Sequence, residues 1–179
     1  TMVEAVAIRT TGLGGDSEVH FCSEGLAGGV TLGPCRVLPI SLIAHEAPDV
    51  VLPALDRQLR AVMPGDYDGK FVRAVPGGDT AGLSARDQAV FARIGAQTHP
   101  LDRLLSTRVE YLSIQRFVAR GLVQLSGVTP SDASHVLGML SAWNREAAAI
   151  GLALMGRRRT GAGDPLARAP EHMAKIIID

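Results

Sequence analysis

Hydrophobic and polar positions alternate in short runs over the first part of the chain. The segments VEAVAIRT (3–10), SEVHFC (17–22) and GVTLGPCRVLPISL (29–42) have the partly alternating, often β-branched composition of short strands. KFVRAV (70–75) has the same character and precedes a turn-forming PGGD. We therefore expect a small antiparallel β-region up to about residue 80.

The hydrophobic period changes from two residues to that of a helix near Pro48. Pro48 can open a helix that carries Val51, Leu55 and Leu59 on one face, and Pro53 should make its first turn irregular. We therefore expect one helix, beginning near Pro48, within the otherwise mainly β part of the chain.

Three hydroxyl side chains, each followed three residues later by an acid, predict helix starts after residue 80. Such residues can cap the free backbone N–H groups of the first helical turn. The second helix should bury four apolar residues and end at Gly121. A short helix is expected between the first two, an Ala-rich helix over about 144–159, and a last one from Pro165 or Pro170. The capping pairs are Ser84 with Asp87, Thr107 with Glu110, and Thr129 with Asp132, and the four apolar residues are Leu112, Ile114, Phe117 and Val118.

These patterns predict one α+β unit over residues 1–179, with 1–80 mainly β and 81–179 mainly α. The chain has 46% hydrophobic residues, enough for a globular core. Its 18 basic and 18 acidic residues balance, so no net positive field attracts the whole chain to nucleic acid or anionic lipid. Two cysteines without a C-x-x-C pair favour a reducing, cytoplasmic compartment, and no apolar run is long enough to cross a membrane.

The stretch TTGLGGDSEVHF (10–21) has the most concentrated chemistry in the sequence. Its glycines do not complete the dinucleotide pattern G-x-G-x-x-G, a strand follows where that pattern needs a helix, and the Lys-Ser/Thr of a P-loop is missing. Glycines permit both a tight turn and the close approach of a ligand to the backbone. A hairpin turn and a ligand-contacting loop both remain open.

Strand alternation places Asp16, Glu18 and His20 on one face, while Val19 and Phe21 point to the core. Three such groups could move a proton or bind a metal, but a solvated sheet face has the same pattern, and we assign no metal site. The other histidines are scattered and are expected to be structural. The RRR run at 157–159 could hold phosphate or simply complement the dipole at a helix C-terminus.

A nucleic-acid-binding function is an alternative from another class. The succession of helices over 84–138 resembles a winged helix, and Arg108, Gln115, Arg116 and Arg120 would give the third helix a modest basic stripe. Because the chain is neutral overall, we do not expect nucleic acid as its main partner. A purely structural or subunit-contact segment is the other alternative.

Two stretches together resemble the hydantoinase/oxoprolinase family, the hydantoin-utilisation protein A group. They are TMVEAVAIRTTGLGGDSEVHF (1–21), with its Gly-Gly-Asp-Ser turn, and RGLVQLSGVTPSDASHVLG (120–138), with its Thr-Pro-Ser-Asp-Ala helix start. The resemblance implies a fragment of an actin-like ATPase domain from an ATP-dependent hydrolase. Such an enzyme opens cyclic amides of the hydantoin or 5-oxoproline type.

The resemblance also implies where the chemistry lies. Gly14, Gly15, Asp16 and Ser17 would line the substrate or nucleotide cleft, with Glu18 and His20 as possible accessory groups. Many relatives carry glycine where Asp16 stands, so the catalytic residues stay unassigned. ATP with Mg would be bound by phosphate loops before Thr1 and an adenosine loop after Asp179. We therefore expect no cofactor in the fragment and no turnover by it alone, and a hydantoinase B-type subunit or domain as partner.

Overall fold

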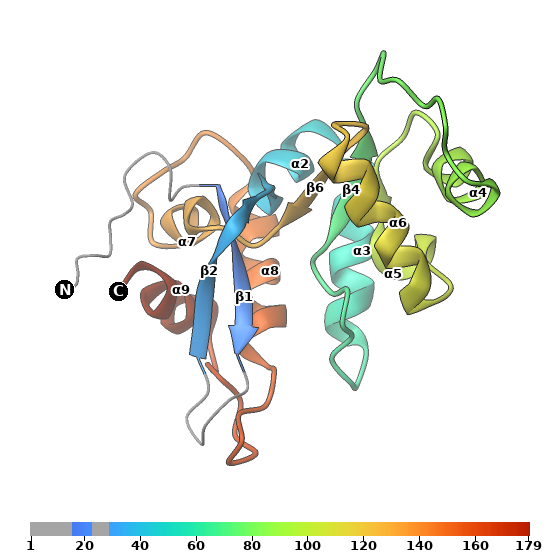
Figure 1. The fold of residues 1–179 in the computed structure, drawn as a ribbon. Coiled ribbons are helices and arrows are strands. Elements are labelled where there is room, and N and C mark those ends of the chain that lie inside the picture. Colours follow the sequence, from blue (N-terminus) through green and yellow to red (C-terminus); the bar gives the residue numbers. More distant parts are fainter. Residues whose placement is uncertain (1–15, 23–28) are drawn as a thin grey trace.

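The computed structural model describes residues 16–22 and 29–179, and it shows a mixed α+β chain (Figure 1). This confirms the α+β class and the presence of a small antiparallel sheet. In chain order the elements are β1 (Ser17–Cys22), β2 (Gly29–Arg36), β3 (Leu38–Pro39), α2 (Ile40–Glu46), α3 (Pro48–Arg60), β4 (Phe71–Ala74), α4 (Ala85–Ile94), β5 (His99–Pro100), α5 (Leu101–Leu104), α6 (Arg108–Ala119), β6 (Val123–Gly127), α7 (Pro130–Val136), α8 (Arg145–Gly156) and α9 (Pro170–Ile178).

The described strands form two sheets. β1 and β2 make an antiparallel hairpin whose register shifts between Ser17 and Val19. The second sheet has the order β3-β6-β4-β5, with β3 parallel to β6 and β4 antiparallel to both of its neighbours. The strand predicted over 17–22 is confirmed, the segments predicted over 29–42 and 70–75 form strands over 29–36 and 71–74, and the strand predicted over 3–10 lies outside the described residues.

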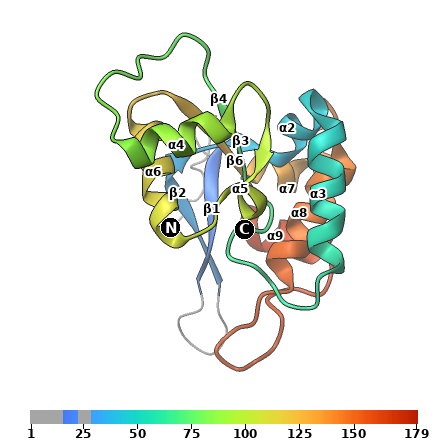
Figure 2. The same ribbon diagram turned by 90° about the vertical axis from the view of Figure 1, so that its right-hand side faces the viewer.

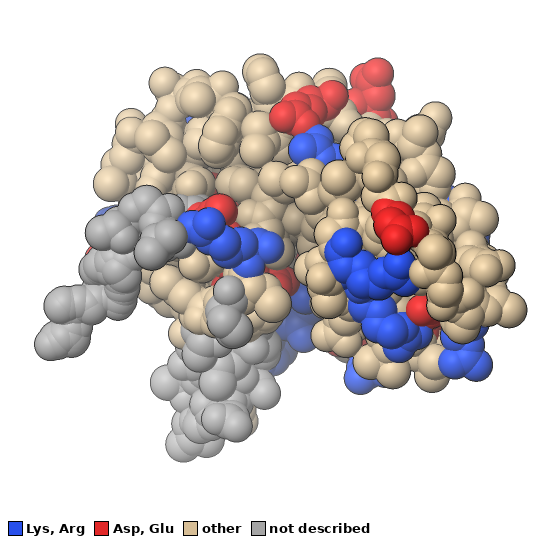
Figure 3. Space-filling model, turned by 45° about the horizontal axis from the view of Figure 1, so that its top comes forward, with Lys and Arg blue, Asp and Glu red and all other residues tan. Residues whose placement is uncertain are grey.

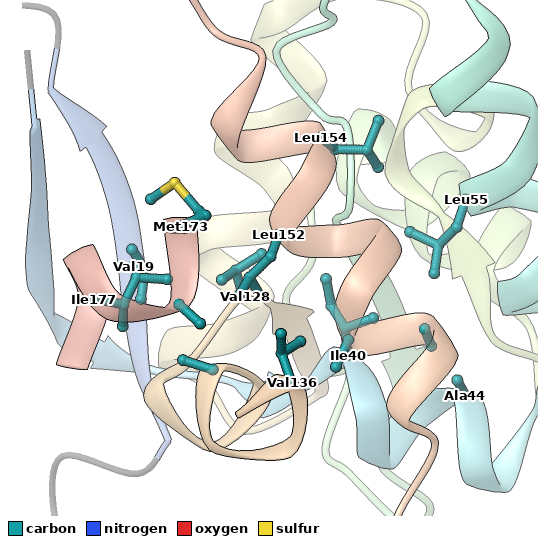
Figure 4. Packing of buried hydrophobic residues seen from close by; sticks show 14 of the residues in the cluster. Val19, Ile40, Ala44, Leu55, Val128, Val136, Leu152, Leu154, Met173 and Ile177 are labelled. Carbon is teal, nitrogen blue, oxygen red and sulfur yellow. The ribbon is translucent and has the colours of Figure 1, made fainter. Parts of the chain in front are cut away.

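Strand β4 separates two hydrophobic clusters, because successive side chains of a strand point to opposite faces. Phe71 belongs to the larger cluster, which includes residues of β1, α2, α3, α7, α8 and α9 (Figure 4). Val72 belongs to the smaller one, with residues of α4, α5, α6 and β6. In Figure 2 the helices of the larger cluster lie on one side of the molecule, and α4 and α6 lie on the other.

Both clusters combine residues from either side of residue 80. The larger cluster combines residues from Val19 to Phe71 with residues from Val128 to Ile177. The first 80 residues also contain helix α2, which was not expected, and strand β6 lies in the part that was expected to be mainly helical. Strands and helices therefore alternate along the chain more finely than the sequence pattern indicated.

The three predicted N-caps are confirmed. The hydroxyl oxygens of Ser84, Thr107 and Thr129 accept hydrogen bonds from the backbone N–H groups of the acids three residues on. Gly121 follows α6 with a φ of 71°, a conformation that favours glycine. Capping pairs lie within one turn of each other, so the local sequence suffices to define these helix starts.

The buried face of α6 differs in part from the prediction. Ile114 and Phe117 are fully buried, as expected. Leu112 is 50% exposed and Val118 is 37% exposed, so the expectation that they are buried was wrong. Ser113 instead faces the core side of α6, where its hydroxyl donates a hydrogen bond to Asp87 of α4 at 2.7 Å. The hydrophobic pattern predicted that Leu112 and Val118 would be buried on this face of α6. The structure instead buries Ser113 there, where it makes a polar contact between the two helices.

The residues of ISL (40–42), expected to continue a strand, instead begin helix α2. Pro39 at its N-cap makes no side-chain capping hydrogen bond. The backbone N–H groups of Ile40 and Ser41 donate instead to the carboxylate of Asp132, at 3.0 and 2.8 Å. Asp132 is the third residue of α7 and completes the capping box of Thr129, so one buried carboxylate caps two helices. Burial raises the pKa of Asp132, while the hydrogen bonds from Ser41, Ile40 and Thr129 act against that shift.

Helix α8 lies close to α2 because its contact face is built from small residues. Ala147, Ala148 and Gly151 are buried, as the Ala-rich pattern suggested. A Cβ atom at Gly151 would lie 2.7 Å from Cδ1 of Ile40. The glycine therefore permits a close approach that any larger residue would oppose.

Candidate functional site

The two stretches that carry the family resemblance meet in the structure. The backbone N–H of Val19 in β1 donates a hydrogen bond to the carbonyl oxygen of Val128, just before α7, at 2.9 Å. Cγ of Glu18 lies 3.8 Å from the position that a Cβ of Gly127 would take. The hairpin is thereby joined to the end of β6, although these segments are far apart in the sequence.

A pocket with a volume of about 160 Å³ opens beside this junction. Its walls combine apolar side chains with charges of both signs, and they come from β1, the 66–70 segment, the residue that follows β6, and helix α8 with the segment just after it. The lining residues are Val19, His20, Asp66, Asp68, Lys70, Val128, Gly151, Leu154, Met155 and Arg158. A concave site with apolar walls and a few convergent polar groups is the usual form of a small-molecule site.

Glu18 lies behind the pocket wall and contacts two of the lining residues. Its side chain is only 9% exposed; Oε1 lies 3.4 Å from Nε2 of His20, and Oε2 lies 3.6 Å from Nζ of Lys70. Burial raises the pKa of Tyr111, and the negative charge of Glu18 adds to that shift. The alternative that Glu18 belongs to a solvated sheet face is therefore wrong for this residue.

Asp16 is not part of this cluster. Its Oδ1 lies 3.3 Å from Nε of Arg36 on the neighbouring strand, and both side chains are about half exposed. The predicted common face assumed regular alternation through residues 16 to 20, but the register shifts between Ser17 and Val19. The structure thus brings Glu18 and His20 together and places Asp16 in a separate ion pair.

The RRR run has mainly structural contacts. Arg157 donates to the carbonyl oxygens of Gln58, Leu59 and Ala61 at the end of α3, and to Asp68 at 3.0 Å. Arg158 donates to the carbonyl of Gly65, and Arg159 to that of Gly163. These contacts favour a structural interpretation of the run over a phosphate site, although Arg158 also lines the pocket.

Two further histidines have structural roles. Nε2 of His135 accepts a hydrogen bond from the backbone N–H of Trp143 at 3.2 Å, so its Nδ1 is the nitrogen that donates to the carbonyl of Ser131. The His135 ring also stacks on Trp143. Nε2 of His99 lies 2.6 Å from the carbonyl oxygen of Ile94. Both are satisfied within the fold, as expected of scattered histidines.

The predicted cleft residues are only partly covered by the structure. Gly14 and Gly15 lie outside the described residues. Asp16 and Ser17 are described but do not line the pocket, and their role in a cleft stays a prediction. Lys70, Asp66 and Asp68 were missed, because they lie in an irregular loop segment without a spacing motif. Their concentration of charge between Pro64 and β4 was the only available signal.

The walls of this pocket are poorly suited to a nucleoside triphosphate. Within residues 16–22 and 29–179, no three His, Cys, Asp or Glu side chains are grouped so that they could hold a metal ion. The pocket places Asp66 and Asp68 on its own walls, where they would repel a triphosphate.

In comparisons with known proteins, no family model, no curated protein and no solved structure matches the chain. Among the helices that the structure describes, none combines the length and the apolar character needed to span a membrane.

Proposed function

We propose that this chain is part of an ATP-dependent hydrolase that opens five-membered cyclic amides, such as hydantoins or 5-oxoproline. One structural observation supports the proposal: the two stretches that resemble the hydantoinase/oxoprolinase family are hydrogen-bonded to each other, from Val19 to Val128 at 2.9 Å. A small pocket lies at this junction. Motifs that serve one site are expected to adjoin it, even when the chain separates them.

The chain's contribution in this proposal is to bind the ring. Val128, Leu154 and Met155 supply apolar walls that suit the carbon atoms of a small ring, and Lys70 and Arg158 supply positive charge for its carbonyl oxygens. ATP and Mg belong to the proposal through the family resemblance alone. A hydantoinase B-type partner and a cytoplasmic location have the same basis.

The decisive experiment uses the complete polypeptide that contains this chain, together with the product of any adjoining hydantoinase B-type gene. We expect ADP release that depends on hydantoin, N-methylhydantoin or 5-oxoproline, with one ring opened for each ADP. The 179-residue chain alone should show only background turnover. ADP release that no cyclic amide stimulates would refute the function, and full activity of the isolated chain would refute the assignment of ATP binding to other segments.

Gly14 and Gly15 provide a test of the ligand-contacting loop. Replacement of either glycine by Ala should lower ring opening by the complete polypeptide more than it lowers the thermal midpoint of this chain, if ligand approaches their backbone. Loss of folding with no separate loss of catalysis would show that the loop is only a turn. Gly77→Ala, at a glycine with a φ of 79° that lies outside both resembling stretches and does not line the pocket, is the control for backbone strain alone.

A second candidate function, nucleic-acid binding, is favoured by one topological observation. α4, β5, α5, α6 and β6 follow one another as the helices and strands of a winged helix do, with β4 paired between β5 and β6. Lys and Arg side chains also gather over the part of the molecule that carries α6 (Figure 3).

The contacts of α6 oppose this candidate. Arg116 is bound to Asp87, Arg120 to two carbonyl oxygens, and Arg108 to Asp66, while Leu112 on the same helix is half exposed. Binding of duplex DNA by this chain at sub-micromolar concentration, weakened by salt and by Arg116→Ala, would establish the nucleic-acid function. Absence of a mobility shift at low salt would eliminate it.

A further inference from the structure

Lys70 lines the pocket and has hydrogen-bonding capacity that the described residues do not use. Its ammonium group carries three N–H donors. The distance of 3.6 Å from Nζ to Oε2 of Glu18 makes an ion pair but exceeds the usual length of a hydrogen bond. The side chain is 30% exposed and lines the pocket. Lys70 can therefore donate to a ligand without giving up a side-chain hydrogen bond to any residue that the structure describes.

Glu18 holds this ammonium group in place. A carboxylate that is 91% buried is costly unless cations compensate it, and among the described residues Lys70 and His20 lie within 4 Å of Glu18. Glu18 pairs with Lys70 but does not itself line the pocket, whereas Lys70 does. Glu18 is thus a positioning residue for Lys70.

The other walls define the class of ligand. Val19, Val128, Leu154 and Met155 offer apolar surface, so part of the ligand should be hydrocarbon. Lys70 and Arg158 are positive and favour an anionic oxygen. A volume of about 160 Å³ admits a molecule of several heavy atoms, since one water occupies roughly 30 Å³ in the liquid.

The ligand should carry a single negative charge. Asp66 and Asp68 line the same pocket. Asp66 is paired with Arg108 at 2.6 Å and lies 3.9 Å from Arg158, and Asp68 is paired with Arg157 at 3.0 Å, so both carboxylates already have cationic partners. Their carboxylates still repel a dianion such as phosphate more strongly than a monoanion.

We propose that this pocket binds a small organic monocarboxylate, whose oxygen atoms accept hydrogen bonds from Lys70 beside the guanidinium of Arg158. The hydrocarbon part of the ligand lies against the apolar side chains of β1 and α8. This site stands on the pocket's own geometry and does not require the proposed ring-opening reaction.

Two probes of nearly equal shape test the proposal on the purified chain. Cyclopentanecarboxylate carries the charge, and cyclopentanecarboxamide replaces it with a neutral amide. We expect calorimetric titration to show the carboxylate binding about tenfold to hundredfold more tightly, as a charge-assisted hydrogen bond predicts. Lys70→Met should remove this difference. Lys175→Met, which changes an exposed lysine on α9, should preserve it.

Several results would overturn the proposal. These are equal affinities of the two probes for the unaltered chain, an undiminished preference in Lys70→Met, and tighter binding of inorganic phosphate than of the carboxylate. If Lys70→Met does not fold, Lys70→Gln keeps a polar side chain of similar length and should show the same loss. Binding of the carboxylate with no ring-dependent ADP release by the complete polypeptide would refute the proposed reaction and leave this site intact.

Discussion

Replacement of Asp132 should destabilise the chain more than the loss of a single helix cap does. Its two carboxylate oxygens accept hydrogen bonds from three backbone N–H groups, those of Ile40, Ser41 and Thr129, at 2.8–3.0 Å. The hydroxyl groups of Ser41 and Thr129 donate to it as well, at 2.6 and 3.2 Å. All four residues are buried, so water cannot replace the missing acceptor.

The magnitude follows from the donors left behind. Asp132→Ala leaves three buried N–H groups without an acceptor, and each such group costs about 1–3 kcal/mol. Removal of a buried, desolvated charge returns part of this, which gives a net loss of about 3–5 kcal/mol. Asp132→Asn keeps one acceptor oxygen, so its loss of unfolding free energy should be about half as large. Thr129→Ala removes only one capping hydroxyl and should cost about 1 kcal/mol.

Urea denaturation at neutral pH, followed by circular dichroism, measures these losses as changes in unfolding free energy at constant m-value. Asp56→Ala is the matched control, because Asp56 forms an exposed ion pair with Arg60 on one helix and should cost about 0.5 kcal/mol or less. If the unfolding free energy of Asp132→Ala lies within about 1 kcal/mol of that of the unaltered chain, the two helices do not depend on the shared carboxylate. That result would refute the prediction.

Three further predictions concern other contacts. The hydrogen bonds from Arg116 and Ser113 lower the pKa of Asp87 to about 2. The contribution of its ionised carboxylate to the free energy of unfolding is therefore complete above about pH 4 and disappears as the pH falls from about 4 to 2. Because Arg116 is half exposed, we expect this contribution to be about 1 kcal/mol. It is measured as the difference in unfolding free energy between the unaltered chain and Asp87→Asn, which should vanish at low pH; a difference that stays constant with pH would contradict the prediction. Phe117→Ala should cost about 3–5 kcal/mol in unfolding free energy, whereas Val118→Ala should cost less than about 1 kcal/mol, and equal losses would show that α6 is oriented differently. Arg157→Ala should lower the thermal midpoint clearly, since its guanidinium holds the end of α3, while Arg159→Ala should leave it nearly unchanged.

The candidate site was only partly accessible to sequence reasoning. Glu18 and His20 were identified because they lie two residues apart on one strand, and the structure keeps them together. Lys70 was missed, because nothing in its own segment relates it to β1; only the folded chain places its ammonium group 3.6 Å from Glu18. Asp16 is instead paired with Arg36, and the shift in strand register beside it leaves no mark on the alternation pattern.

The sequence by itself determined the starts of α4, α6 and α7. Ser84, Thr107 and Thr129 each satisfy backbone donors within their own first turn, so neighbouring residues contain all the required information.

Only the tertiary structure decided that residues 40–46 form a helix. The donors at the start of α2 are satisfied by Asp132, 92 residues beyond Ile40, and no local pattern can report an acceptor that folding brings from so far along the chain. The pocket also depends on the tertiary structure. Its walls come from β1, the 66–70 segment and α8, which form a cavity only when hydrophobic burial packs them together.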